Sequence, residues 1–212
     1  MSRAALWIEF LVLFVAVPLG YRFSPRPIPA LPVLWAAALY CYWMLRRDSA
    51  FSQELLWNPR PALAQLPSIL IFFVIAAVLV WLAVRWIAPG LLFSFVRARP
   101  GLWALVMILY PVLSAYPQGI VYRSFLMHRY APLFPSSVVM IVISAAAFAF
   151  MHIIFRNPLA VTLTFVGGLL FAWRYKATGS LFTSSLEHAL YGCWLFTVGL
   201  GQYFYHGRIA LK

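Results

Sequence analysis

The chain has 212 residues, of which 65% are hydrophobic and only 9% are charged. A soluble domain of this size needs far more charge to cover its surface, so the composition excludes one. The net charge of +12 does not indicate nucleic-acid binding, because the basic residues stand singly or in pairs between apolar runs. Basic residues in that arrangement are typical of loops that face anionic lipid, and the basic, Trp-rich composition suits a bacterial inner membrane.

Apolar runs of membrane-spanning length follow one another along the whole chain. A transmembrane helix needs about 20 apolar residues, and short loops between such runs favour neighbouring antiparallel helices. The sequence therefore predicts an all-α fold, a polytopic membrane helical bundle with about seven transmembrane helices. Pro111 and Pro117 interrupt the fourth run, and Arg174 is expected in the loop that follows the sixth. The runs are residues 4–19, 29–45, 66–87, 102–126, 136–155, 159–173 and 181–205.

Several polar residues stand inside the last four runs or in the short loops between them. An ionisable group at membrane depth costs on the order of 3 kcal/mol, so each one needs a partner, a hydrated cavity or a task. If these side chains converge, an imidazole and a carboxylate could activate water, while a second imidazole, an amide or a guanidinium could stabilise an oxyanion. The same set could instead bind an anionic headgroup or relay protons. The candidates are Gln118, Arg123, His152, Asn157, Glu187 and His188.

No cofactor is expected at these residues. Zinc is the alternative, since His152, His188 and Glu187 are possible ligands. The sequence has no His-Glu-x-x-His pair, however, and the three residues come from only two helices. Glu187 could also be a structural ion-pair partner, and Asn157, just before Pro158, a simple loop turn.

Three short strings in the second half of the chain carry a family resemblance. Residues 116–126 read YPQGIVYRSFL, residues 148–152 read FAFMH, and residues 188–192 read HALYG. In order and spacing they resemble the Glu-Glu-x-x-x-Arg, Phe-x-x-x-His and His-x-x-x-Asn motifs of the CAAX protease and bacteriocin-processing family (CPBP or Abi, Rce1-like intramembrane proteases). The resemblance covers roughly residues 102–201. It implies a CPBP-like protease core at 101–212, preceded by N-terminal transmembrane helices at 1–100.

The resemblance also implies a role for each matching position. The motif glutamate that activates water falls on Gln118 or Gly119, and neither is a carboxylate; a glutamine can orient water but cannot take its proton. The motif-two histidine, which assists in activating the water, is His152. The motif-three histidine that holds the oxyanion is His188, and the asparagine beside it falls on Gly192. Arg123 keeps the motif arginine, and Asn157 is a further candidate for a substrate or oxyanion contact.

The expected function is therefore an intramembrane endopeptidase of the CAAX-processing type. Its partners would be membrane lipid and a membrane-associated protein or peptide substrate, with no nucleic acid. Because Gln118 and Gly119 replace the motif glutamates, the chain could be inactive, or Glu187 could serve as the base from another helix. The alternative is a non-catalytic membrane binding protein, a pseudoprotease on the same scaffold; a small transporter or channel would show a two-half symmetry that the sequence lacks.

Overall fold

The computed structural model describes residues 2–25, 28–134 and 136–204, and within these residues the fold consists of helices and connecting loops without a strand. The all-α prediction is confirmed. The helices are α1 (Arg3–Leu11), α2 (Val17–Phe23), α3 (Ala30–Arg47), α4 (Arg60–Ile87), α5 (Ser94–Ala98), α6 (Pro100–Tyr110), α7 (Tyr116–Gly119), α8 (Leu126–Arg129), α9 (Ser137–Met151), α10 (Pro158–Thr178) and α11 (Leu181–Val198).

Five continuous helical segments of the described chain are long and apolar enough to cross a membrane. They contain α1–α2, α4, the α6–α8 segment, α9 and α10. Helices α3 and α11 have 18 residues each but stand outside this group. α3 ends on two arginines, and α11 carries Glu187 and His188, which lowers the mean hydropathy of both helices. The polytopic membrane bundle is confirmed, while the number seven stays a prediction.

The fourth predicted run forms one long bent helix instead of breaking at its prolines. The chain continues from α6 through a π-helical segment, η4 (Pro111–Ala115), into α7, and through a second one, η5 (Ile120–Phe125), into α8. Proline lacks the N–H that would bond to the carbonyl four residues earlier, and wider π-type turns absorb that loss. The expected interruption at Pro111 and Pro117 is therefore wrong.

Helices α4 and α10 are longer than the apolar runs that predicted them. α4 begins at Arg60 instead of residue 66, which places Gln65 inside a helix. α10 continues past residue 173 to Thr178, and the side chain of Arg174 is fully buried. The prediction that Arg174 lies in a loop is wrong, because its charge finds partners inside the bundle that hydropathy does not show.

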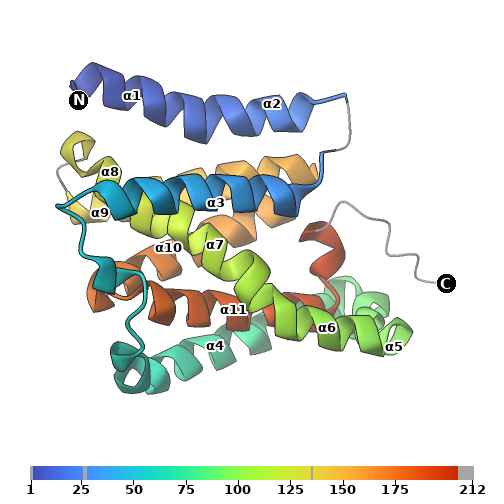
Figure 1. The fold of residues 1–212 in the computed structure, drawn as a ribbon. Helices are drawn as coiled ribbons and strands as arrows, with labels where there is room; N and C mark the ends of the chain where they lie inside the picture. The colour runs from blue at the N-terminus through green and yellow to red at the C-terminus, as the bar shows by residue number, and fades with distance from the viewer. Residues whose placement is uncertain (1, 26–27, 135, 205–212) are drawn as a thin grey trace.

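Helix α11 lies in the middle of the bundle, where it contacts α4, α6, α7 and α10. Figure 1 shows α1 and α2 along one side, next to α3, with α4 on the opposite side. Two contacts tie the outer helices to α8, an ion pair from Glu9 to Arg129 and a hydrogen bond between Asp48 and His128. The hydrogen bond with the His128 ring, and one from the Ala50 N–H, lower the pKa of the Asp48 carboxyl.

Helices α9 and α10 approach closely at Gly168, as expected for a small residue between membrane helices. A Cβ atom at this position would lie 3.1 Å from the Ala145 Cα and 3.1 Å from the Phe148 Cδ1. Backbone on one side and a buried ring on the other leave no room for a larger side chain. This contact also positions Phe148, whose ring packs against Arg123, His152 and His188.

A Gly168→Leu variant should therefore push α9 away from α10 and lower the free energy of unfolding by about 1–3 kcal/mol, the usual cost of overpacking. Unfolding in mixed detergent micelles would measure the change. Gly101→Leu is the matched control, because a Cβ at Gly101 meets nothing within 4 Å. Equal stability of the two variants would contradict this account of the α9–α10 contact.

Candidate active site

Arg123 lies on the π-helical segment η5, and its side chain is 1% exposed. Its Nη2 donates a hydrogen bond to the Nδ1 of His188, 3.1 Å away. The guanidinium also lies over the rings of Phe148 and Phe171, at 5.5 and 5.7 Å from their centroids. Its Nε and Nη1 have no hydrogen-bond partner among the described residues. A buried cation with unused donors is costly, which marks this arginine as part of a site.

The contact with Arg123 fixes the tautomer of His188. A guanidinium can only donate, so Nδ1 must accept, and the proton of the neutral ring is on Nε2. That Nε2–H donates to the hydroxyl oxygen of Tyr110, 3.2 Å away. The imidazole stacks on the ring of Phe171 with 4.6 Å between centroids, which holds its plane in place. His188 therefore presents a donor on its Nε2 side.

His152 has the opposite tautomer. It lies at the end of α9, where its Nδ1–H donates to the carbonyl of Phe148 at 2.7 Å. A carbonyl only accepts, so Nε2 carries the lone pair and can take a proton. Both imidazoles pack edge-on against the Phe148 ring, at 4.8 Å for His152 and 5.4 Å for His188. The structure thus brings Arg123, His152 and His188 together around one phenylalanine.

A cavity of about 1450 Å³ opens beside these residues. Apolar side chains from α3, α4, α6, α9, α10 and α11 line most of it. Polar side chains on its wall include those of Tyr110, Gln118, His152 and His188. A mostly apolar pocket with a few convergent polar groups is typical of a binding or catalytic site.

Gln118 and Gly119 have different surroundings, although both replace motif glutamates. Gln118 lines the cavity and donates from Nε2 to the Ser114 hydroxyl at 2.7 Å. Position 119 faces α11: a Cβ there would lie 2.7 Å from the Leu181 Cδ1, 2.8 Å from the Ser185 Oγ and 3.3 Å from the Arg123 Nη2. A side chain at 119 would thus point at the guanidinium, but Leu181 and Ser185 now fill the space.

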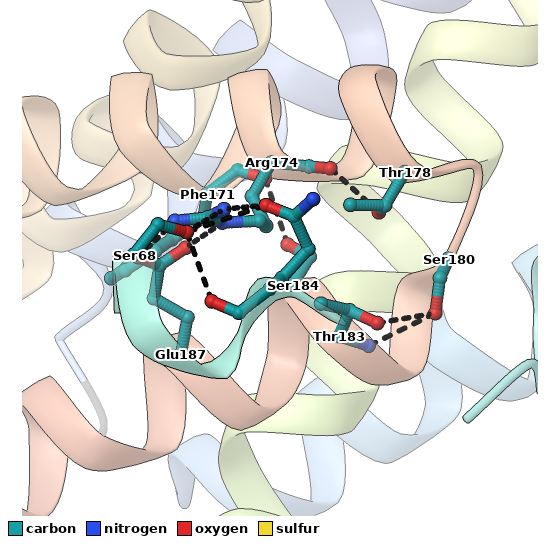
Figure 2. Close-up of polar contacts among 9 residues, drawn as sticks. Ser68, Phe171, Arg174, Thr178, Ser180, Thr183, Ser184 and Glu187 are labelled. Carbon is teal, nitrogen blue, oxygen red and sulfur yellow. Dashed lines mark hydrogen bonds and ion pairs between the residues drawn. The ribbon is translucent and has the colours of Figure 1, made fainter. Parts of the chain in front are cut away.

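Glu187 lies apart from this group, in a second buried polar cluster shown in Figure 2. Its carboxylate pairs with Arg174 through Nε–Oε2 at 2.8 Å and Nη2–Oε1 at 3.1 Å, and both side chains are fully buried. The Nη1 of Arg174 donates to Gln65 and Ser68 of α4. Every nitrogen of the Arg174 guanidinium and both carboxylate oxygens of Glu187 have a hydrogen-bond partner, so the pair holds α11 against α10 and α4.

Asn157 also has a structural environment. It is the N-cap of α10, where its Oδ1 accepts from the Ala160 N–H at 2.8 Å. Its Nδ2 donates to the carbonyl of Tyr203 at 2.9 Å, and the side chain does not line the cavity. In the described residues no three His, Cys, Asp or Glu side chains gather into a possible metal site, and Glu187 is turned to Arg174.

Sequence reasoning missed two residues of these clusters, Tyr110 and Arg174. A signal for Arg174 exists: α10 and α11 are joined at Gly179 and Ser180, and Arg174 and Glu187 stand at nearly equal distances from this turn, so the two face each other. Tyr110 carries no such signal, because a tyrosine in an apolar run is indistinguishable from the other aromatic residues there.

Replacing Glu187 by Gln should leave the Arg174 cation buried and unpaired, so we expect the free energy of unfolding to fall by about 3–5 kcal/mol. Unfolding of purified protein in mixed micelles measures this. Glu54→Gln, at an exposed carboxylate, is the control and should change stability very little. If both variants unfold alike, the Glu187–Arg174 pair does not contribute to stability as the geometry indicates.

Residues 100–194 match the model of the family described as type II CAAX prenyl endopeptidase Rce1-like. The match contains Arg123, His152 and His188 and confirms the resemblance seen in the three motifs. The chain matches no curated protein and no solved structure. Over residues 100–194 the chain is therefore similar to the type II CAAX prenyl endopeptidase Rce1-like family.

Proposed function

We propose that this chain is an intramembrane endopeptidase of the CAAX-processing type, which hydrolyses a peptide bond in a membrane-associated substrate. The observation that carries the proposal is the pair of opposite tautomers, His152 with a lone pair and His188 with a proton on Nε2, on the wall of one apolar cavity. We place the protein in a bacterial inner membrane, on the basis of its basic, Trp-rich composition.

The two imidazoles supply complementary steps of an amide hydrolysis. A water oriented by the Gln118 Oε1 gives its proton to the His152 Nε2 as its oxygen bonds to the substrate carbonyl carbon. The carbonyl oxygen becomes an oxyanion on the side of His188, where the buried Arg123 charge favours negative charge. His152 then returns the proton to the nitrogen as the C–N bond breaks, which gives a carboxylic acid and an amine.

The absence of a carboxylate at position 119 has a cost for this mechanism. A general base contributes about 10²- to 10⁴-fold, and an imidazole alone replaces only part of what a carboxylate and imidazole do together. We therefore expect slow hydrolysis compared with relatives that keep the glutamate. Because the cavity is largely apolar, its substrate would be an extended apolar segment.

The second candidate is a pseudoprotease that binds a membrane substrate without cutting it. Position 119 favours this reading, since Leu181 Cδ1 and Ser185 Oγ fill the space a catalytic carboxylate would need. The two candidates differ in one respect. Capture by a pseudoprotease would survive the loss of the His152 imidazole, whereas hydrolysis would not.

The purified full chain in liposomes can be tested on two fluorogenic probes, a prenylated peptide ending in a CAAX sequence and a single-span peptide without a lipid. We expect slow cleavage of at least one probe and a fall of about 10²-fold or more in rate for His152→Ala, which removes the base. His128→Ala is the control, because His128 pairs with Asp48 away from the cavity. Probe capture without cleavage, unchanged in His152→Ala, would favour the pseudoprotease instead.

Restoring the carboxylate is a separate test. Gly119→Glu combined with Leu181→Ala should place a carboxylate beside Arg123 and raise the cleavage rate by about 10- to 10²-fold. Gly119→Gln with Leu181→Ala is the matched control, because it adds the same bulk without the charge. A rise in neither variant, with both folded, would show that position 119 is not the place of the missing base.

A further inference from the structure

We infer that Tyr110 donates a hydrogen bond to the oxyanion of the substrate and takes the place of the motif-three asparagine that this chain lacks. The inference rests on the proposed function, since it names a further catalytic residue in the same site. Tyr110 ends α6, just before the π-helical segment η4, and its ring lines the cavity next to His188.

The direction of the hydrogen bonds leaves the hydroxyl proton of Tyr110 unused. Arg123 Nη2 donates to His188 Nδ1, so the remaining proton of the neutral ring is on Nε2, where the Tyr110 hydroxyl can accept its hydrogen bond but cannot donate one; the Ala115 backbone is a further hydrogen-bond partner of this imidazole. In the described part of the chain, the Tyr110 hydroxyl has no other hydrogen bond. Its own O–H can therefore turn to the cavity. The three groups form a donor chain with a cation at its head, and such chains strengthen each member.

Gly192 supplies the second observation. It stands one helical turn after His188 on α11, at the position of the motif asparagine. A Cβ atom at 192 would collide with the Tyr110 ring and hydroxyl. The phenol thus occupies the volume that a side chain at 192 would fill, beside the same histidine. Tyrosine at 110 and glycine at 192 are compatible with each other, and an asparagine at 192 is not compatible with this tyrosine.

The two residues offer the same chemistry to a substrate. An asparagine amide and a phenol are both neutral donors, and either can stabilise an oxyanion next to an imidazole. Loss of one such donor costs about 10²- to 10³-fold in kcat. The role assigned to Tyr110 is therefore in transition-state stabilisation, and the KM should change much less than kcat.

Tyr110→Phe removes the hydroxyl and keeps the ring. We expect kcat on the cleaved probe to fall by about 10²-fold, and the affinity for a phosphinate analogue of that peptide, which carries a tetrahedral oxyanion, to fall far more than the affinity for the peptide itself. Tyr191→Phe is the matched control, because this ring lines the same cavity without contacting His188 through its hydroxyl. Equal behaviour of the two variants overturns the role of Tyr110.

The exchange Tyr110→Ala with Gly192→Asn provides the complementary test. It returns the amide to the motif position and vacates the colliding ring, so we expect phosphinate affinity within about tenfold of the parent chain. Gly192→Asn alone should lose that affinity. If Tyr110→Phe fails to fold, the exchange decides: rescue supports the inference, and its absence overturns it.

A parent chain that binds neither the peptide probes nor the phosphinate refutes the proposed function itself, which is a different result.

Discussion

The hydrogen bond from the Arg123 guanidinium to His188 is the interaction on which the candidate site depends. It holds a buried cation in the middle of a membrane bundle, where a charge raises the free energy of the fold unless a partner or a chemical role compensates for it. It also decides which nitrogen of His188 carries the proton, and so which partners the imidazole can serve. Without this contact the ring could adopt either tautomer, and its Nε2 side would have no defined role.

The two fully buried arginines of the described chain show two ways to keep such a charge. Arg174 has a carboxylate, an amide and a hydroxyl around it, and each of its three nitrogens donates a hydrogen bond. Arg123 has one imidazole and two aromatic faces, and two of its nitrogens are unused. A saturated buried ion pair is typical of a structural contact, whereas an unsaturated cation beside a cavity is typical of a binding or catalytic group.

Helices and motif residues could be predicted from the sequence because each depends on local information. Runs of apolar residues dictate spanning helices, and Arg123, His152 and His188 stand out as costly polar groups inside them. Hydropathy did not predict the interior position of Arg174, because a cation just past the end of an apolar run is typical of a loop; only its spacing from the α10–α11 turn, opposite Glu187, indicates a buried partner. The neighbourhood of Glu187 could not be predicted, because adjacent residues on a helix point about 100° apart and only the packing shows which one faces the cavity.

Position-by-position comparison with a motif had a further limit. Gln118, Gly119 and Gly192 appear in the sequence only as departures from the family pattern. Their meaning comes from neighbours distant in the chain: Leu181 and Ser185 close over Gly119, and the Tyr110 ring fills the space beside Gly192. When a glycine replaces a larger motif residue, the sequence does not show which distant side chain fills the space that the lost side chain would have occupied.

The π-helical segments on either side of α7 bear on how this part of the chain tolerates a change of length. A wide turn holds one more residue than an ordinary turn, so deletion of a single residue from η5 would return the backbone to regular α-helix. Because the wide turn absorbs the extra residue, the side chains before and after the deletion would keep their directions relative to each other, whereas the same deletion from a regular α-helix would rotate them by about 100°. In evolution, η5 could therefore lose a residue with less disturbance of the flanking helices than α9 or α10 could.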